Sequence, residues 1–248
     1  MLGHEKLIVY EKSLQFVSVS DALLGRISKE VAACDHLGRA SESIPLNIAH
    51  ASTAWAPPER ITYLGHANGS ALECAACLDV LVVKQLLPGS DVLAGKGLLR
   101  EIVNMLIAME KSTSNRVREE DDAAYLTRDG GFFSHERLDV YQVSLVFTGW
   151  VETVSRAFSC SADLLAKLDK SSTAVVLNIA EGNGRFSGSD HARFLGIAHK
   201  AVVQSASLLD LATARNAVAR ERAQEGQDML RRVAAMLTSL AKRVSPYS

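Results

Sequence analysis

The chain has 248 residues and a mass of 26.7 kDa, which is enough for one large domain or for two of about 110 to 120 residues. Its composition, 48% hydrophobic and 22% charged with a net charge of −1, is that of an ordinary globular protein and lacks the basic excess usual for nucleic-acid binding. No apolar run approaches the roughly 18 residues of a membrane helix, and charges at Glu5, Lys6 and Glu11 interrupt any signal-peptide core, so we expect a cytoplasmic protein without a membrane partner.

An internal repeat at a fixed offset of 131 residues is the most informative feature of the chain. The segment SESIPLNIAHA, from Ser41 to Ala51, is echoed by STAVVLNIAEG, from Ser172 to Gly182. Further matches at this offset need no gap and include His4 with His135, Tyr10 with Tyr141, Leu64 with Leu195, Leu78 with Leu209 and Met105 with Met236. A repeat of this kind indicates two copies of one structural unit.

The repeat divides the chain into a first copy (1–111), a linker (112–134) and a second copy (135–248). The linker contains an acidic cluster and a Gly130-Gly131 pair, which is typical of a connecting segment. The three parts carry net charges of −2, −2 and +3. The positive second copy is a weak indication of an anionic partner.

Each copy contains four segments with the apolar periodicity of a helix. In the third segment the small and apolar residues form a continuous seam, made of Leu64, Ala67, Ala71, Cys74, Leu78 and Leu81, and of Leu195, Ala198, Val202, Ser205, Leu209 and Ala212. In the first segment the same periodicity predicts one buried face, made of Leu7, Tyr10, Leu14, Val17 and Leu24. No stretch has the pattern of a strand. The sequence therefore predicts an all-α protein of two tandem antiparallel up-and-down four-helix bundles.

Asn47 and Asn178 occupy matching positions in the second segment of each copy, in an apolar context. Asparagine is a poor helix former and is costly to bury without a hydrogen-bond partner. We therefore predict structural polar pairs between helices, Asn47 with Glu73 and, at the matching positions, Asn178 with Gln204. Such pairs would fix the helix register, as a buried asparagine does in coiled coils.

The turn after the second segment differs between the copies. In the second copy it reads Glu181-Gly182-Asn183-Gly184-Arg185, and Ser187 then has capping-box spacing to Asp190. We interpret it as a tight turn between helices. The alternative is an anion site made of Glu181, Gly182, Gly184, Arg185 and Ser187, because free backbone N–H groups before a helix bind phosphate. The first copy has Ala51 to Trp55 here, so only one copy could carry such a site.

Several classes of active site find no support in the residue pattern. Cys74 and Cys77 form a single CxxC within the apolar seam, which favours core packing over zinc or redox chemistry. No glutamate is followed by histidine three residues later, as di-iron bundles require, and no phosphate-loop, dinucleotide or nucleophile-elbow motif occurs. We expect no metal, no cofactor and no enzymatic activity; a ligand bound at the Glu181 turn would argue for an enzyme.

The string Asn178-Ile179-Ala180-Glu181-Gly182, followed by Arg185 and then by Phe194-Leu195 in an Ala-rich helix, resembles the 23S rRNA intervening-sequence four-helix-bundle family, which includes the accessory protein of diversity-generating retroelements. The first copy departs from the family pattern at His50-Ala51 but keeps GSALE from Gly69 to Glu73. The resemblance covers both copies and implies an up-and-down bundle, a tendency to oligomerise and, for most members, no known catalysis. It also implies that one branch binds a reverse transcriptase and nucleic acid through a basic surface.

The leading prediction is a non-enzymatic interaction or scaffold protein, with two bundles packed as a pseudo-symmetric dimer about an isologous interface and with further self-association. The alternative is a nucleic-acid-binding accessory factor, with RNA or a reverse transcriptase as partner, that acts through the second copy. Its predicted contacts are Arg185, Arg193, Arg215, Arg220, Arg222, Arg231 and Arg232.

Overall fold

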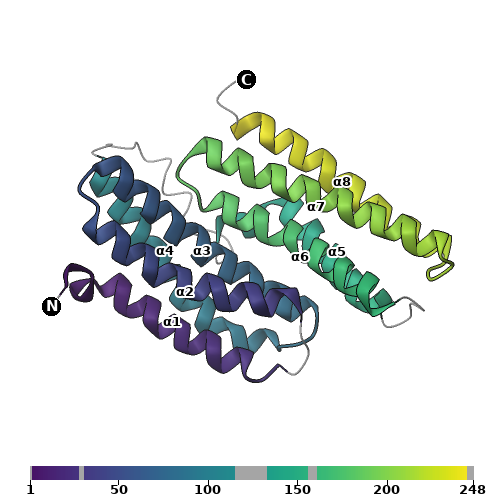
Figure 1. Ribbon diagram of the computed structural model, residues 1–248, viewed down its shortest axis with the longest axis horizontal. Coiled ribbons are helices and arrows are strands. Elements are labelled where there is room, and N and C mark those ends of the chain that lie inside the picture. Colours follow the sequence, from purple (N-terminus) through teal and green to yellow (C-terminus); the bar gives the residue numbers. More distant parts are fainter. Residues whose placement is uncertain (1, 28–30, 115–132, 156–160, 245–248) are drawn as a thin grey trace.

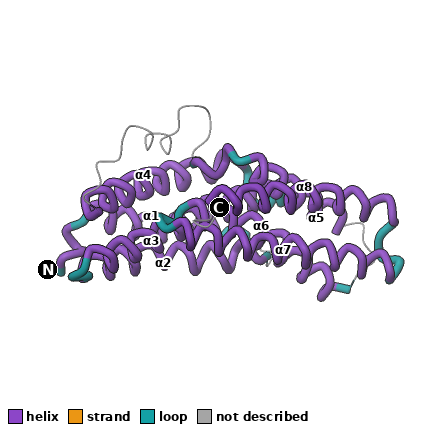
Figure 2. The backbone as a smooth tube through the Cα atoms, turned by 90° about the horizontal axis from the view of Figure 1, so that it is seen from above, coloured by secondary structure: helices purple, strands orange, loops and turns teal. Residues whose placement is uncertain are grey.

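The computed structural model describes residues 2–27, 31–114, 133–155 and 161–244. These residues form long helices without a strand, arranged as two bundles side by side (Figures 1 and 2). The first bundle consists of α1 (Ile8–Leu24), α2 (Ala32–Thr53), α3 (Pro57–Val83) and α4 (Gly89–Ser114). The second consists of α5 (Asp139–Ser155), α6 (Ala162–Asn183), α7 (Gly188–Ala214) and α8 (Arg220–Val244). Short 3-10 helices, η1 (Gly3–Lys6) and η3 (Ser134–Arg137), precede α1 and α5.

The repeat in the sequence is reproduced in the structure, so the prediction of two tandem four-helix bundles is confirmed. Helix α7 begins and ends 131 residues after α3, and η3 follows η1 at the same offset. Even the residues that turn the chain after α3 and α7 match, since Gln85 (φ 59°) and Asn216 (φ 53°) both adopt the left-handed conformation common at helix ends. Helix α4 continues to Ser114, and residues 115–132 of the predicted linker lie outside the described residues, so the domain boundaries stay predictions.

The core of each bundle is built on the predicted seam, because every seam residue of α3 and α7 is buried. Burial also raises the pKa of the Cys74 and Cys77 thiols well above their usual value, as suits core residues.

The predicted face of α1 is wrong. The buried residues of this helix are Val9, Ser13, Phe16, Ser20 and Leu23, whereas Leu14 is 45% exposed. The true face contains two serines, and the Ser13 hydroxyl donates a hydrogen bond to the Tyr10 carbonyl within the helix. Apolar periodicity alone therefore selected a different face of α1, the one that contains Tyr10 and Leu14. The matching residues of α5, Tyr141 and Leu145, are buried.

The two bundles meet through unlike helices. Helix α3 packs against α6 and α5, and α2 makes a smaller contact with α6 (Figure 1). An isologous interface would require α2 to pack on α7 as α3 packs on α6, and among the described helices that contact is at most marginal. The predicted isologous arrangement is therefore wrong, and the interface is heterologous: the α5–α6 side of one copy covers the third helix of the other.

Candidate functional site in the pocket between the bundles

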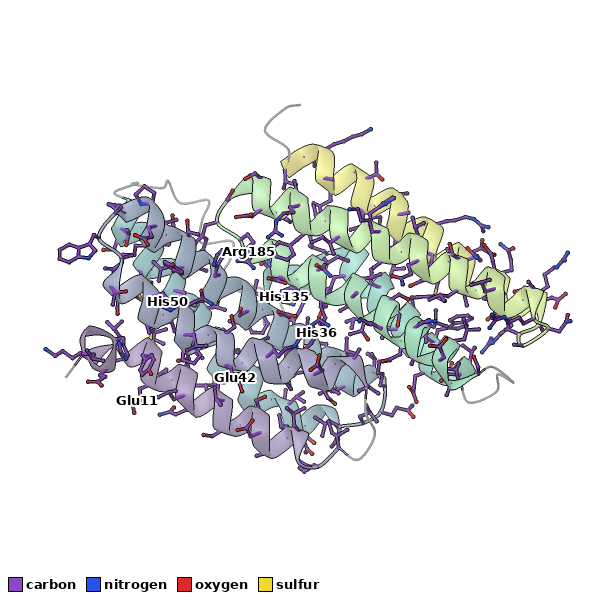
Figure 3. All side chains as sticks on the ribbon, in the orientation of Figure 1. Glu11, His36, Glu42, His50, His135 and Arg185 are labelled. Atoms are coloured by element: carbon purple, nitrogen blue, oxygen red, sulfur yellow. The ribbon has the colours of Figure 1, made fainter. Side chains whose placement is uncertain are left out.

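A polar pocket of about 480 Å³ lies where α2 and α3 of the first bundle face the α6–α7 turn of the second. Its charged and polar lining comes from both copies and includes His36, Asn47, Glu73, Glu181, Arg185 and Arg193. Figure 3 labels two of these residues, Arg185 and His36, between the bundles. A volume of this size accommodates a small metabolite.

The α6–α7 turn reaches the pocket because its glycines allow close packing. A Cβ atom on Gly184 would lie 2.9 Å from the Cα atom of Gly69, and one on Gly182 would lie 2.8 Å from the Phe194 Cβ. The Asn68 side-chain amide donates to the Gly184 carbonyl at 2.8 Å, which fastens the turn to α3. These contacts place Arg185 at the junction of the bundles.

The predicted anion site at the start of α7 does not form as a cradle of free N–H groups. The Gly184 and Arg185 amides already donate to carbonyls of the last turn of α6, at 3.0 and 3.1 Å. Ser187 caps α7, accepting a hydrogen bond from the Asp190 amide at 3.4 Å. The glycines serve helix packing, so an anion would meet the Arg185 side chain in the pocket rather than the backbone of the turn.

The Arg185 side chain is only 9% exposed and is incompletely paired. Its Nη2 atom pairs with Glu181, while Nε and Nη1 are buried without a hydrogen-bond partner among the described residues. Leaving a buried donor unpaired costs about 1–3 kcal/mol. The guanidinium carbons of Arg185 and Arg193 lie 4.7 and 4.5 Å from the centroid of the Phe194 ring, so one aromatic ring holds both cations.

Two carboxylates complete the pocket. Glu73 pairs with His36, with 2.9 Å between Oε1 and Nδ1. Burial raises the pKa of Glu181, and the nearby charge of Glu73 raises it further, against the opposing effect of Arg185. Burial also lowers the pKa of His66, assisted by the charge of Arg185. The site therefore contains neighbouring charges of both signs.

The predicted polar pairs are wrong. The Asn47 amide donates to the Ser43 carbonyl and hydroxyl of its own helix, at 2.8 and 3.0 Å, while Glu73 pairs with His36. Asn178 likewise donates to the Ala174 carbonyl at 2.7 Å, and Gln204 is exposed. An asparagine within a helix can satisfy its amide on the preceding turn, which removes the need for a partner on another helix.

A buried charge cluster between the bundles was missed by the sequence analysis. The Lys96 ammonium pairs with Asp79, at 2.7 Å, and with Glu136, and the Tyr141 hydroxyl donates to Asp79 at 2.8 Å. The acidic groups lie close to His135 in an arrangement that could hold a metal ion, but Lys96 already supplies the cation. The repeat offered a signal, because Asp79 and Tyr141 have counterparts in Asp210 and Tyr10.

The arginines predicted to contact nucleic acid do not gather into one basic patch. Arg193 and Arg215 lie near opposite ends of α7, about 33 Å apart at 1.5 Å per residue. Arg193, Arg222 and Arg231 pair with acidic neighbours on their own helices, and Arg185 is in the pocket. Arg220 and Arg232 lie on α8, the helix that also carries these acidic partners of Arg222 and Arg231. Nucleic-acid binding stays a prediction to which this arrangement adds no support.

The fold and the pocket define a tandem pair of four-helix bundles joined by a heterologous interface. The family model for the 23S rRNA-intervening sequence protein matches residues 5–108 and 136–239, and the chain belongs to this family, in two copies. No curated protein matches the chain. Within the described residues, every helix is too short or too polar to cross a bilayer.

Proposed function

We propose that this protein is a non-catalytic scaffold that self-associates head to tail. The observation that carries the proposal is the heterologous interface within the chain. Within the chain, the α5–α6 side of the second copy covers α3 of the first copy, so the fusion uses the covering face of one copy and the receiving face of the other. The covering face of the first copy and the receiving face of the second remain open, and such faces join identical chains into rings or filaments.

The open covering face lies on α1, α2 and the turn after α2. It contains Leu14, Leu46, which is 59% exposed, and Trp55, which is 99% exposed. The counterparts of the first two, Leu145 and Leu177, are buried, and the counterpart of Trp55 is Phe186, which packs on α3. Large exposed apolar residues grouped in this way are typical of an interaction surface.

The open receiving face lies on α7. Val203 and Leu211 are 54% and 47% exposed, whereas their counterparts in α3, Leu72 and Val80, are buried. Gly196 has nothing within 4 Å of the position of a Cβ atom. The face of α7 that corresponds to the covered face of α3 thus exposes two apolar side chains, like the covering face of the first copy, beside the polar residues Lys200 and Asp210.

Two pairs of residues that join the bundles have counterparts on the open faces. The Phe186 ring lies 3.4 Å from the position of a Cβ atom on Gly65, and the matching pair is Trp55 and Gly196. Tyr141 donates to Asp79, and the matching pair is Tyr10 and Asp210. We expect both matching pairs to form between two molecules.

The open faces also differ from the interface within the chain. Lys200 replaces Gly69, and Thr53 replaces Gly184. With side chains at these positions, the two backbones cannot approach each other as closely as Gly69 and Gly184 do within the chain. We therefore expect contacts between chains to be weaker and reversible, with assembly that depends on protein concentration.

Light scattering coupled to size-exclusion chromatography, over a range of protein concentrations, tests the proposal. The natural chain should form species larger than one chain, and Trp55→Glu and Leu211→Glu should each weaken association about 30-fold or more, as charges at the centre of an interface do. Leu93→Glu is the control, because Leu93 is exposed on α4, away from both open faces. A natural chain that stays monomeric at every concentration would contradict the proposal.

Mixing the two variants separates head-to-tail association from an isologous dimer. Trp55→Glu retains an intact α7 face, and Leu211→Glu retains an intact α1–α2 face, so an equimolar mixture should form a 1:1 dimer that does not grow. An isologous interface built from either face alone would instead let one of the variants self-associate as the natural chain does.

A further inference from the structure

The charged lining of the pocket is not required by the bundle fold. At the matching positions in the other copy, uncharged or different residues replace the main polar groups: Gln204 for Glu73, Ile197 for His66, Ala54 for Arg185 and His50 for Glu181. Both copies nevertheless fold as the same four-helix bundle. The charged set therefore belongs to this one junction, and packing alone does not account for it.

Two arginine side chains line the pocket and are held in place. Arg185 and Arg193 both stack on Phe194, which limits the movement of their guanidinium groups. A side chain at Gly69 would collide with Arg185, because a Cβ atom there would lie 2.9 Å from its Nε atom. Glu181 occupies only Nη2, and the Nε and Nη1 donors of this side chain, which is more than nine-tenths buried, are left without an acceptor among the described residues. A carboxylate is a natural acceptor for a guanidinium group.

Two carboxylates line the same pocket. Glu73 and Glu181 come from different bundles, and their negative charges are close enough to disfavour ionisation of Glu181. Each carboxylate has one oxygen paired within the protein, Glu73 with His36 and Glu181 with Arg185. An ammonium group near both carboxylates would relieve their repulsion.

We propose that the pocket binds a small zwitterion that carries a carboxylate and an ammonium group, an α-amino acid or a close relative of one. The carboxylate meets Arg185 and Arg193, and the ammonium meets Glu73 and Glu181. Asn47, Ser43 and Ser70 also line the pocket and contact the rest of the ligand. Because the ligand touches both bundles, its binding also strengthens their junction.

Isothermal titration calorimetry of the full chain with the twenty standard amino acids tests this proposal. At least one amino acid should bind at one site per chain. The corresponding carboxylic acid without the amine, and the amine without the carboxylate, should bind at least tenfold more weakly. Inorganic phosphate and nucleoside monophosphates serve as the probes for a purely anionic ligand.

Variants locate the binding site. Arg193→Gln removes one cation from a side chain that is 58% exposed, so it should leave the fold intact and weaken amino-acid binding about tenfold or more. Glu73→Gln removes one of the two carboxylates and should weaken binding to a similar extent. Arg222→Gln is the matched control, since Arg222 pairs with Glu225 on α8, away from the pocket, and should leave the dissociation constant unchanged.

Three outcomes would overturn the proposal: no binding of any amino acid at millimolar concentration, binding that Arg193→Gln and Glu73→Gln both leave unchanged, or binding of phosphate or nucleotides alone. The test is independent of self-association. Trp55→Glu should bind the amino acid as tightly as the natural chain does.

Discussion

Helices α3 and α7 are copies of one element with opposite surroundings. Both present the same seam to their own bundle, but the far face of α3 is covered by α5 and α6, whereas the far face of α7 is open. The covered helix contains Gly65 and Gly69 with packed neighbours, and the open helix keeps only the first glycine, as Gly196. The difference shows that the shared seam sets the fold of each copy. The residues on the face that points away from the helix's own bundle determine how the two copies pack together.

The largest difference between the copies is expected at Lys96 and its counterpart Gln227. Lys96→Met removes the buried ammonium group from the mostly buried carboxylates of Asp79 and Glu136, which should lower the free energy of unfolding by about 3–5 kcal/mol. Gln227→Met removes a hydrogen bond to the Ala206 carbonyl and one to the exposed Asp210 carboxylate, and it should cost about 1 kcal/mol. Urea denaturation measures both. Equal losses in the two variants would contradict the account of the buried cluster.

Close packing at the junction gives the next largest effect. Gly184→Ala places a Cβ atom 2.9 Å from the backbone of Gly69, which cannot yield easily, so we expect a loss of about 1–3 kcal/mol. Gly97→Ala, within α4, meets nothing within 4 Å and should stabilise the protein by up to about 1 kcal/mol through helix propensity. Thermal unfolding distinguishes the two variants. If Gly184→Ala leaves the stability unchanged, close packing of the turn on α3 does not contribute to the stability of the protein.

His135 and His4 occupy matching positions in the two copies, and the buried His135 should make the free energy of unfolding depend on pH. Burial lowers the pKa of His135 to about 3, and neither ring nitrogen has a hydrogen-bond partner among the described residues. The unfolded chain takes up this proton near pH 6.5, so unfolding binds a proton between pH 6.5 and 3, and the free energy of unfolding falls as the pH falls, by about 1.4 kcal/mol per unit.

His135→Phe should remove this dependence. Relative to the natural chain, the variant should gain about 2 kcal/mol between pH 6.5 and 5, as followed by urea denaturation at each pH. His4→Phe is the matched control, because it makes the same substitution at the matching position of the first copy, where the histidine is only half-buried. Parallel pH profiles for His135→Phe and the natural chain would exclude a buried neutral histidine.

The smallest effect is expected at the matched tyrosines. Tyr141→Phe removes a buried hydrogen bond to Asp79, which keeps its ion pair with Lys96, so the loss should be about 1 kcal/mol. Tyr10→Phe should leave the stability of the single chain within about 0.5 kcal/mol and should weaken self-association instead. If light scattering shows unchanged association for Tyr10→Phe, the proposed pairing with Asp210 is wrong.

The sequence predicted much of the fold and only the components of the pocket. Periodicity identified the seam of α3 because its residues are apolar, and it failed on α1 because Ser13 and Ser20 belong to the buried face. Glu181 and Arg185 were singled out together at one turn and Glu73 separately as a partner of Asn47, but nothing in the sequence indicated that the three share a pocket, since Glu73 comes from the first bundle and the other two from the second. Lys96 escaped notice because a buried lysine resembles a surface lysine until its partners are placed.

The sequence by itself determined that this protein is two copies of one helical bundle, because a fixed offset and a repeated apolar seam need no knowledge of distant contacts. Only the tertiary structure decided which helices join the copies, since the residues that differ between the far faces of α3 and α7, such as Gly69 and Lys200, do not show by themselves which helices will cover them. The pocket depends on this packing, because its charged residues come together only where the α6–α7 turn packs on α3. Contacts between the two bundles produce no periodic pattern in the sequence, so the sequence could not predict them.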